Sequence, residues 1–416
     1  MVTGSISTLF VNNDCLAQSI ERLAQIGKLP EGGVRRIAYS SEDIQARNTL
    51  QQWMMEAGMS VRVDAAGNII GRYPGKFSQA PVLATGSHID TVPNGGRYDG
   101  AFGVLAGLEV VRLLNEQRLQ LNHPLEVIVF TDEEGSMIGS KAMSGKVIND
   151  PACYLRHDGT NIQTCLARVG GNWEHIAYAR RSPEDVAAFV ELHVEQGPIL
   201  ESLGKQIGVV EGVVGQRRYT ITVEGSSSHA GSTPMYMRRD ALVAASQVVL
   251  TVHKLANTPG EQVATIGRMQ VSPNAANVIP GSVEMSLDIR DLSNSHIDGL
   301  MDQLQLQLKA IAKDTQTQIS LQPFLYNEPA PAKPHIQQMI AQVCEELGLS
   351  YSYLPSRASH DAQEIANFAD MGMIFVPSEA GVSHAETEYT SPEQCTQGAN
   401  VLLHTLLKLD QHYPCT

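Results

Sequence analysis

The residues that first raise a chemical question are Asp132, Glu133 and Glu134, three consecutive acids in the stretch FTDEEGS. They follow LEVIVF, an apolar run at residues 125–130 that is typical of a buried strand. Two carboxylates about 4 Å apart repel each other by on the order of 4 kcal/mol when the effective dielectric is near 20. Such a cluster indicates either a solvated acidic turn or a bound cation.

Histidines and further acids follow other predicted strands. His88 in GSHIDT comes directly after an apolar strand, and the Asp90 carboxylate two residues later could hold the far nitrogen of its ring. Asp99 lies in GGRYDGAFG, His193 in ELHVEQG and His384 in GVSHAE. Taken singly, Asp99 is more simply the N-cap of the helix after it, and each histidine could be an ordinary hydrogen-bonded residue.

Taken together, these positions favour a metal site. In open α/β sheets, ligands bind where the strands end at their carboxyl edge. Two histidines and three carboxylates form a suitable shell for two divalent ions that share one carboxylate. One glutamate would then be neutralised by a metal, and its neighbour would accept a proton from bound water. The sequence contains no G-x-S-x-G, no phosphate-binding glycine motif and no H-E-x-x-H.

The elements that must position these residues form two patterns. From about residue 40 to 210, strand-like and helix-like segments alternate, which predicts an α/β domain with a central, largely parallel sheet covered by helices. The order then changes to β-α-β-β-α-β, which can close a sheet of its own. After PAPAKP at residues 329–334, a plausible linker, the alternation resumes. We therefore predict a discontinuous domain at 1–212 and 327–416, with a smaller domain inserted at 213–326.

Composition narrows the class of protein further. A chain of 416 residues fits two domains, and its net charge of −14 argues against nucleic acid or an anionic membrane as partner. The six cysteines are scattered without a C-x-x-C pair, as in proteins of reducing compartments. Neither a signal-peptide pattern nor an apolar run of about 18 residues occurs. We expect a cytoplasmic protein.

Several long motifs occur in the order known from one enzyme family. The sequence resembles the zinc-dependent aminoacylase and carboxypeptidase-type metallohydrolases. Within them it is most similar to the branch of N-carbamoyl-L-amino-acid hydrolases, allantoate amidohydrolases, ureidoglycolate amidohydrolases and yeast-type β-ureidopropionases. The resemblance spans nearly the whole chain and rests on GSHIDTVPNGGRYDGAFGV, TDEEGS, ELHVEQGPILE, VGQRRYTITVEGSSSHAGSTPM, NVIPGSVEMSLDIRD, SRASHDAQ and MIFVPSEAGVSHAE.

The resemblance implies a dinuclear metal centre. Asp99 would bridge two divalent ions, with Zn favoured and Mn, Co or Ni also suited to a mixed shell of imidazole and carboxylate. Glu133 would be the general base and acid. The remaining ligands would be His88 and His193 at one ion, and Glu134 and His384 at the other.

The resemblance also makes the inserted domain a lid and dimerisation domain. His229, Asn277 and Arg290 would bind the substrate, and His229 would reach into the neighbouring subunit's site, which implies a homodimer. Gln196 and His360 would also bind the substrate, with His360 next to the metal site. Arginine suits this role because its guanidinium can grip a carboxylate through two hydrogen bonds, and every substrate of the branch carries a carboxylate.

His193 and the following Gln196 favour the ureido branch, because the peptidases of the wider family typically have a carboxylate in place of this histidine. The expected reaction is cleavage of the ureido C–N bond of a small ureido acid, such as an N-carbamoyl-L-amino acid or allantoate, with release of ammonia and carbon dioxide. The short segment after Ser136, and Arg357 and Ser359 where relatives often have glycines, leave the individual substrate open. The alternatives are a dinuclear aminopeptidase or aminoacylase and, more distantly, a non-catalytic small-molecule-binding protein.

Overall fold

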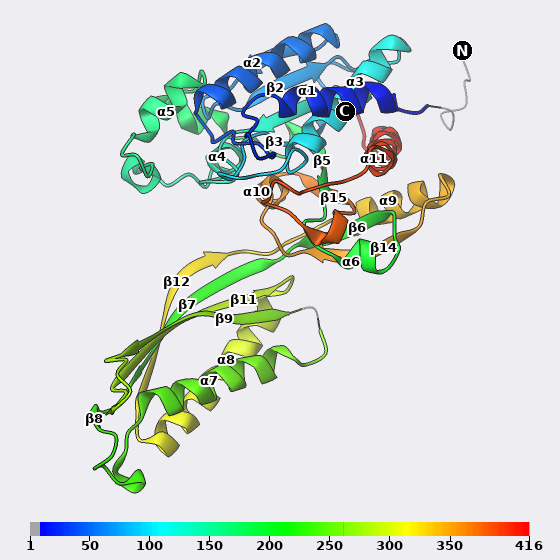
Figure 1. Ribbon diagram of the computed structural model, residues 1–416. Coiled ribbons are helices and arrows are strands. Elements are labelled where there is room, and N and C mark those ends of the chain that lie inside the picture. Colours follow the sequence, from blue (N-terminus) through cyan, green and yellow to red (C-terminus); the bar gives the residue numbers. More distant parts are fainter. Residues whose placement is uncertain (1–8, 261, 416) are drawn as a thin grey trace. The chain divides into compact units, whose positions relative to one another are not determined.

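The computed structural model describes residues 9–260 and 262–415 (Figure 1). The chain divides into two compact units, one formed by Met1–Gly212 with Pro331–Thr416 and the other by Val213–Ala330. The first unit is therefore discontinuous in sequence, and the second is a single continuous segment. Among the described residues, no helix is long and apolar enough to cross a membrane.

The first unit is built on a mixed sheet with the strand order β1-β2-β4-β3-β5-β15-β6-β13, and β14 pairs with β6. Its central strands β4, β3, β5 and β15 run parallel, and the flanking pairs are antiparallel. The predicted α/β architecture with a largely parallel central sheet is confirmed. The strands are β1 (Ser60–Val63), β2 (Ile69–Tyr73), β3 (Val82–His88), β4 (Leu125–Phe130), β5 (Val186–Val194), β6 (Ile207–Val213), β13 (Ala330–Pro331), β14 (Tyr351–Ser356) and β15 (Asp370–Val376).

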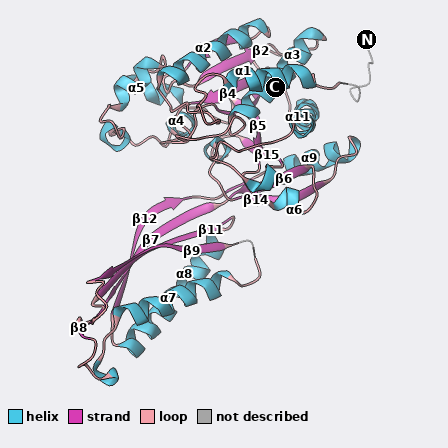
Figure 2. Ribbon diagram, viewed as in Figure 1, coloured by secondary structure: helices cyan, strands magenta, loops and turns pink. Residues whose placement is uncertain are grey.

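Helices lie beside the strands of this unit (Figure 2), and buried apolar side chains of both make up its core. Every residue of β3 and β4 is buried, as expected for parallel strands covered on both faces. Helix α3 (Ala101–Glu116) is buried almost all round, and a Cβ atom at Gly103 would lie 2.1 Å from the carbonyl oxygen of Leu192 in β5. This glycine lets α3 lie directly against the sheet. The other α-helices are α1 (Asn13–Ala24), α2 (Ser41–Glu56), α4 (Ile138–Ser144), α5 (Ile162–Arg168), α6 (Ile199–Ser202), α9 (Pro334–Glu346), α10 (Asp361–Ile365) and α11 (Pro392–His412).

The central strands all end at one edge of the sheet, because they are parallel. In register, His88 at the end of β3 lies beside Phe130 at the end of β4, and Phe375 of β15 lies beside His193 of β5. The loops that follow these strands carry the other predicted site residues. The carboxyl edge of the sheet, where the sequence predicted a metal site, is therefore formed by four strands that are far apart along the chain.

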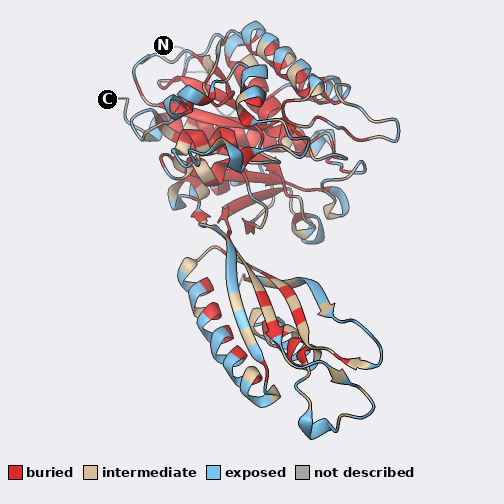
Figure 3. Ribbon diagram, turned by 90° about the vertical axis from the view of Figure 1, so that its left-hand side faces the viewer, coloured by how far each residue is buried: buried red, intermediate tan, exposed pale blue. Residues whose placement is uncertain are grey.

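The second unit has an antiparallel sheet with the order β12-β7-β11-β9, covered on one face by helices α7 and α8. Along β11, alternate residues such as Met285 and Leu287 are buried against these helices, and the residues between them point to the open face (Figure 3). The long elements run β-α-β-β-α-β along the chain. They are β7 (Gly215–Glu224), α7 (Ala241–Ala256), β9 (Val263–Ser272), β11 (Ser282–Asp291), α8 (Asn294–Thr315) and β12 (Gln318–Asn327), with the short strands β8 (Ser228–His229) and β10 (Val278–Ile279) paired to each other.

The proline-rich stretch at residues 329–334 is ordered structure rather than a free linker. Ala330 and Pro331 form β13, and Pro334 begins helix α9 at a position where the missing N–H of proline costs nothing. Between them, the backbone N–H of Ala332 donates to Glu211 O at 3.0 Å. The prolines of this stretch suggested a linker, but its backbone hydrogen-bonds to strand β6 of the sheet.

Candidate metal centre and active site

The carboxylate of Asp99 lies at the centre of the predicted site. Its Oδ1 is 3.6 Å from His88 Nε2 and 3.2 Å from His193 Nε2, and its Oδ2 is 3.2 Å from His384 Nε2. Glu134 Oε1 lies 3.5 Å from the same nitrogen of His384. The five side chains therefore form two groups that share Asp99, and in each group one ligand atom per residue lies within 4.8 Å of the others.

The ring orientations in the first group fit a bound cation. His88 Nδ1 hydrogen-bonds the backbone carbonyl of Asp90 at 3.0 Å, and His193 Nδ1 hydrogen-bonds that of Val194 at 2.8 Å. A carbonyl only accepts, so Nδ1 of each ring carries a proton and Nε2 is the nitrogen turned toward Asp99. His193 Nε2 also accepts the backbone N–H of Gly100 at 3.1 Å. Two ligand atoms about 2.1 Å from a tetrahedral zinc ion lie about 3.4 Å apart, close to the distances found here.

The electrostatics of the site also favour cations. Burial alone would lower the pKa of His88, but the carboxylates of Glu133, Asp99 and Asp90 outweigh burial and raise the pKa well above its ordinary value. The hydrogen bond with Asp99 raises the pKa of His384 to about 9. Both shifts show that the site carries an excess of negative charge, which divalent ions would neutralise.

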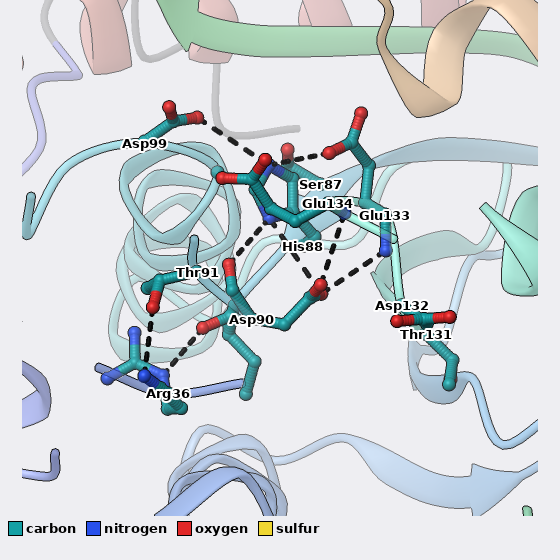
Figure 4. Close-up of polar contacts among 12 residues, drawn as sticks. Arg36, Ser87, His88, Asp90, Thr91, Asp99, Thr131, Asp132, Glu133 and Glu134 are labelled. Atoms are coloured by element: carbon teal, nitrogen blue, oxygen red, sulfur yellow. Dashed lines mark hydrogen bonds and ion pairs between the residues drawn. The ribbon is translucent and has the colours of Figure 1, made fainter. Parts of the chain in front are cut away.

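Asp90 supports the site differently from the prediction. Its carboxylate Oδ1 is 3.9 Å from His88 Nδ1, and the ring is held by the Asp90 backbone carbonyl instead. The two carboxylate oxygens accept hydrogen bonds from the backbone N–H groups of Glu133 at 3.3 Å and Glu134 at 3.2 Å (Figure 4). The chain after β3 turns so that the backbone carbonyl of Asp90 reaches the His88 ring, and the Asp90 carboxylate points to the turn that contains Glu133 and Glu134. Asp90 therefore anchors the glutamate pair.

Glu133 has the surroundings of a general base. Its Oε2 lies 3.6 Å from His88 Nε2, and its side chain is 9 % exposed. Burial is the main reason that the pKa of Glu133 is raised well above its ordinary value, with Asp361 and Glu134 adding to the effect and His88 opposing it. A raised pKa brings a carboxylate closer to the pH at which it can both take and return a proton.

Gln196 and Glu388 hold Asp99 in place. Gln196 Nε2 donates to Asp99 Oδ2 at 2.9 Å, so the contact seen for this predicted substrate-binding residue is with the carboxylate that is predicted to bridge the ions. Glu388 Oε1 accepts the backbone N–H groups of Tyr98 at 2.8 Å and Asp99 at 3.1 Å, and burial raises the pKa of Glu388 to about 7. Sequence reasoning missed Glu388. The available signal was its place four residues after His384 in SHAETE.

His360 lies beside the first group. Its ring is 4.5 Å from the His193 ring in an edge-to-face arrangement, and its Nε2 is 2.8 Å from the hydroxyl of Ser356. Burial lowers the pKa of His360 well below its ordinary value, so the ring is neutral. The structure therefore places this residue within contact of a predicted ligand.

The other three predicted residues belong to the second unit. His229 and Asn277 are neighbours, because β8 pairs with β10 and the backbone N–H of Ala230 donates to Asn277 O at 3.0 Å. His229 Nδ1 accepts the N–H groups of Gly231 and Ser232, both at 3.1 Å, so the neutral ring carries its proton on the exposed Nε2. His229 is thus fixed as a hydrogen-bond donor.

Arg290 lies on the open face of the same sheet. Its Nε donates to Asp288 Oδ1 at 3.1 Å, and its Nη2 donates to Asp288 Oδ2 at 3.3 Å. Arg218 and Gln216 donate to the same Oδ2, at 2.8 and 2.7 Å. Two arginines thus pair with one aspartate on this part of the face.

Comparison with known proteins agrees with the geometry. Residues 84–408 match the model of peptidase family M20/M25/M40. The chain belongs to this family. It is 38 % identical over 406 residues to the N-carbamoyl-L-amino acid amidohydrolase of Geobacillus stearothermophilus, covering 96 % of this chain and 99 % of the other. It is 37 % identical over 400 residues to the allantoate amidohydrolase of Bacillus subtilis, covering 94 % and 96 %.

Comparison with a solved structure indicates the same family. The chain is 39 % identical to an amidase of the hydantoinase/carbamoylase family from Burkholderia multivorans, with a TM-score of 0.89 over 97 % of this chain and 98 % of that one. The family resemblance predicted from the motifs is confirmed. So is the prediction of a hydrolase of the amidohydrolase type.

Exchange of the two adjacent glutamates separates their roles. Glu133→Gln should keep the bound metal and lower kcat by about 10²- to 10⁴-fold, because it removes a proton acceptor that is not a ligand. Glu134→Gln should lose metal, because an amide is a poorer ligand than a carboxylate. Metal content per chain after dialysis, measured by plasma mass spectrometry, distinguishes the two. An emptied site in Glu133→Gln beside a full one in Glu134→Gln would reverse the assignment.

Proposed function

We propose that this protein hydrolyses the ureido C–N bond of a small ureido acid, releasing ammonia and carbon dioxide. The observation that carries the proposal is the buried Asp99 carboxylate, whose two oxygens face two separate groups of imidazole and carboxylate ligands. Similarity over nearly the whole chain to an N-carbamoyl-L-amino acid amidohydrolase and an allantoate amidohydrolase supports this substrate class.

The side chains of the first unit have the positions that such a hydrolysis needs. His88, Asp99 and His193 would hold one divalent ion and Asp99, Glu134 and His384 a second, with Zn favoured. When bound, the ions would supply Lewis acidity for the carbonyl and lower the pKa of the attacking water. Glu133 takes the proton of that water and returns it to the leaving nitrogen. The carbamate that remains after ammonia leaves then loses carbon dioxide.

Residues of the second unit complete the proposal. Arg290 would bind the substrate carboxylate, and the two hydrogen bonds by which Asp288 orients its guanidinium support that role. His229 would donate its Nε2–H to the oxygen that becomes negative in the transition state. Its Nδ1 is already occupied by two backbone N–H groups, so the donor is in place before any substrate binds.

His229 and Arg290 lie near opposite ends of their own sheet. Arg290 pairs with Gln216 at the start of β7, and His229 follows Glu224 at the end of that strand (Figure 1). Eight residues of extended chain span about 26 Å, which is more than a small ureido acid can bridge. We therefore propose that each site takes His229 from a second copy of the chain.

The second unit also offers a surface for such a dimer. Strand β9 is an edge of its sheet, and an unpaired edge is suited to pairing with another chain. Helix α7, which contacts β9, carries large apolar side chains that are exposed in one chain, with Val243 at 51 % and Leu250 at 68 %. Contact with a second copy would bury them.

A substrate panel with a matched pair of variants tests the proposed activity. The protein supplied with Zn or Mn should release ammonia from N-carbamoyl-L-amino acids, allantoate or ureidoglycolate. Arg290→Ala should raise KM by about 10- to 100-fold, since hydrogen bonds to a charged group are worth about 1.5–3 kcal/mol. Lys309→Ala is the control, because Lys309 is an exposed cation on α8, which covers the other face of this sheet. Hydrolysis of acyl amino acids or peptides in place of every ureido acid would point to an aminoacylase or aminopeptidase.

Mixing two inactive variants tests the shared site. If His229 acts in the partner's site, a heterodimer of Glu133→Gln and His229→Ala has one site with both defects and one with neither. Activity should therefore return after the subunits are dissociated and reassembled together. If each site is built within one chain, every site in the heterodimer keeps one defect. A mixture that stays inactive although mass spectrometry shows heterodimers would contradict the shared site.

A further inference from the structure

Arg156 connects a cavity wall to the acidic turn of the proposed active site. A cavity of about 420 Å³ lies beside the turn, and its lining includes Glu134, Asp132 and Arg156. Arg156 also lines a second cavity of about 390 Å³. Its guanidinium lies 5.3 Å from the centre of the Tyr39 ring, and its Nη1 donates to Asp132 Oδ1 at 2.7 Å.

Asp132 is the residue that this ion pair holds. Its side chain is 1 % exposed, whereas that of Arg156 is 22 % exposed. The second oxygen of Asp132, Oδ2, accepts the hydroxyl of Ser136 at 2.6 Å and the backbone N–H of Ser136 at 3.2 Å. The carboxylate thus links Asp132, the first residue of the turn, to Ser136. Arg156 is the cation that pairs with it.

The backbone of Asp132 has an uncommon conformation. Its φ is 58°, in the left-handed region that non-glycine residues adopt only when their surroundings impose it. This residue directly precedes Glu133, so its conformation sets the direction in which the glutamate pair leaves β4. Asp90 holds the N–H groups of that pair, but no contact of Asp90 fixes the Asp132 carboxylate.

Removal of Arg156 would leave a buried carboxylate without its cation. A charge that is buried and unpaired is strongly unfavourable, so the Asp132 side chain would rotate toward the cavity. That rotation would weaken its hydrogen bonds with Ser136, which keep the turn closed. The change would begin one residue from the proposed base, while the ligands on β3, β5 and the segment around His384 would keep their own supports.

We propose that Arg156 is a positioning residue, which holds the Asp132 turn and thereby orients Glu133 for proton transfer. The inference rests on the proposed function for its chemistry, but the ion pair and the conformation of the turn are independent of the substrate. The side-chain hydrogen bond of Arg156 is with Asp132, and its guanidinium lies over the ring of Tyr39. It acts through Asp132.

The test compares Arg156→Ala with Arg156→Lys and with Arg168→Ala, an exposed arginine that lines the second cavity without pairing to Asp132. Arg156→Ala should lower kcat by about 10- to 100-fold, with KM changed less than threefold, as is typical when a supporting partner of a catalytic group is lost. Arg156→Lys should recover most of kcat, and Arg168→Ala should match the wild type. Methylguanidinium, which the partly exposed cavity can admit, should restore part of the activity of Arg156→Ala alone.

A second readout does not depend on turnover. Amide hydrogen exchange over residues 131–137 should become faster in Arg156→Ala, while exchange over α3 and β5 and the metal content stay at wild-type values. The double variant Asp132→Asn with Arg156→Ala no longer has an unpaired charge. Its loss of kcat should therefore be smaller than the losses of the two single variants combined.

The outcomes separate this inference from the proposed function. Wild-type kcat in Arg156→Ala, or unchanged exchange at the turn, would overturn the positioning role whichever amide substrate the wild type hydrolyses. Faster exchange throughout the chain would also overturn it, because Arg156 would then only stabilise the fold. If the wild type cleaves acyl amino acids rather than ureido acids, the proposed function fails, and the same kcat and exchange comparisons still decide the role of Arg156.

Discussion

The buried carboxylate of Asp99, surrounded by the Nε2 atoms of three histidines, is the interaction on which the rest of the first unit depends. Each oxygen of this carboxylate faces imidazole nitrogen, with distances between 3.2 and 3.6 Å. The two groups of residues that share this carboxylate could each hold a metal ion. Close packing of Gly100 against the His88 ring places the Asp99 carboxylate beside these histidines. Gly100 follows Asp99 with a φ of 65°, and a Cβ there would lie 2.4 Å from His88 Nε2. No residue larger than glycine fits.

The ligands are held mainly by the backbone and by buried acids. Backbone carbonyls fix the rings of His88 and His193, Asp90 fixes the N–H groups of the glutamate pair, and Glu388 fixes the N–H of Asp99. Each supporting group is buried, so solvent does not compete for its hydrogen bonds. Buried hydrogen bonds therefore fix the positions of these predicted site residues.

The sequence allowed prediction of the parts that have local signals. Apolar runs that end in histidines or acids marked the ends of β3, β4 and β5, and the spacing of motifs led to the family. Side-chain direction had no such signal. Asp90 was expected to use its carboxylate on His88, but a turn after β3 decides that the carbonyl makes this contact. Glu388 and Arg156 were missed because their partners are distant in sequence, 289 residues away for Asp99 and 24 for Asp132. Only the folded chain brings these pairs together.

The central claim is that one carboxylate holds both ions. Replacement of Asp99 with asparagine keeps the size of the side chain and removes its charge, so it tests that claim directly. Metal content per chain should be measured after dialysis, with His193→Ala as the comparison, because His193 does not belong to the group of Asp99, Glu134 and His384. If Asp99 holds both ions, Asp99→Asn should retain neither, while His193→Ala should retain the ion of the group formed by Asp99, Glu134 and His384. Retention of one ion by Asp99→Asn, with the same metal content as His193→Ala, would contradict a bridging role.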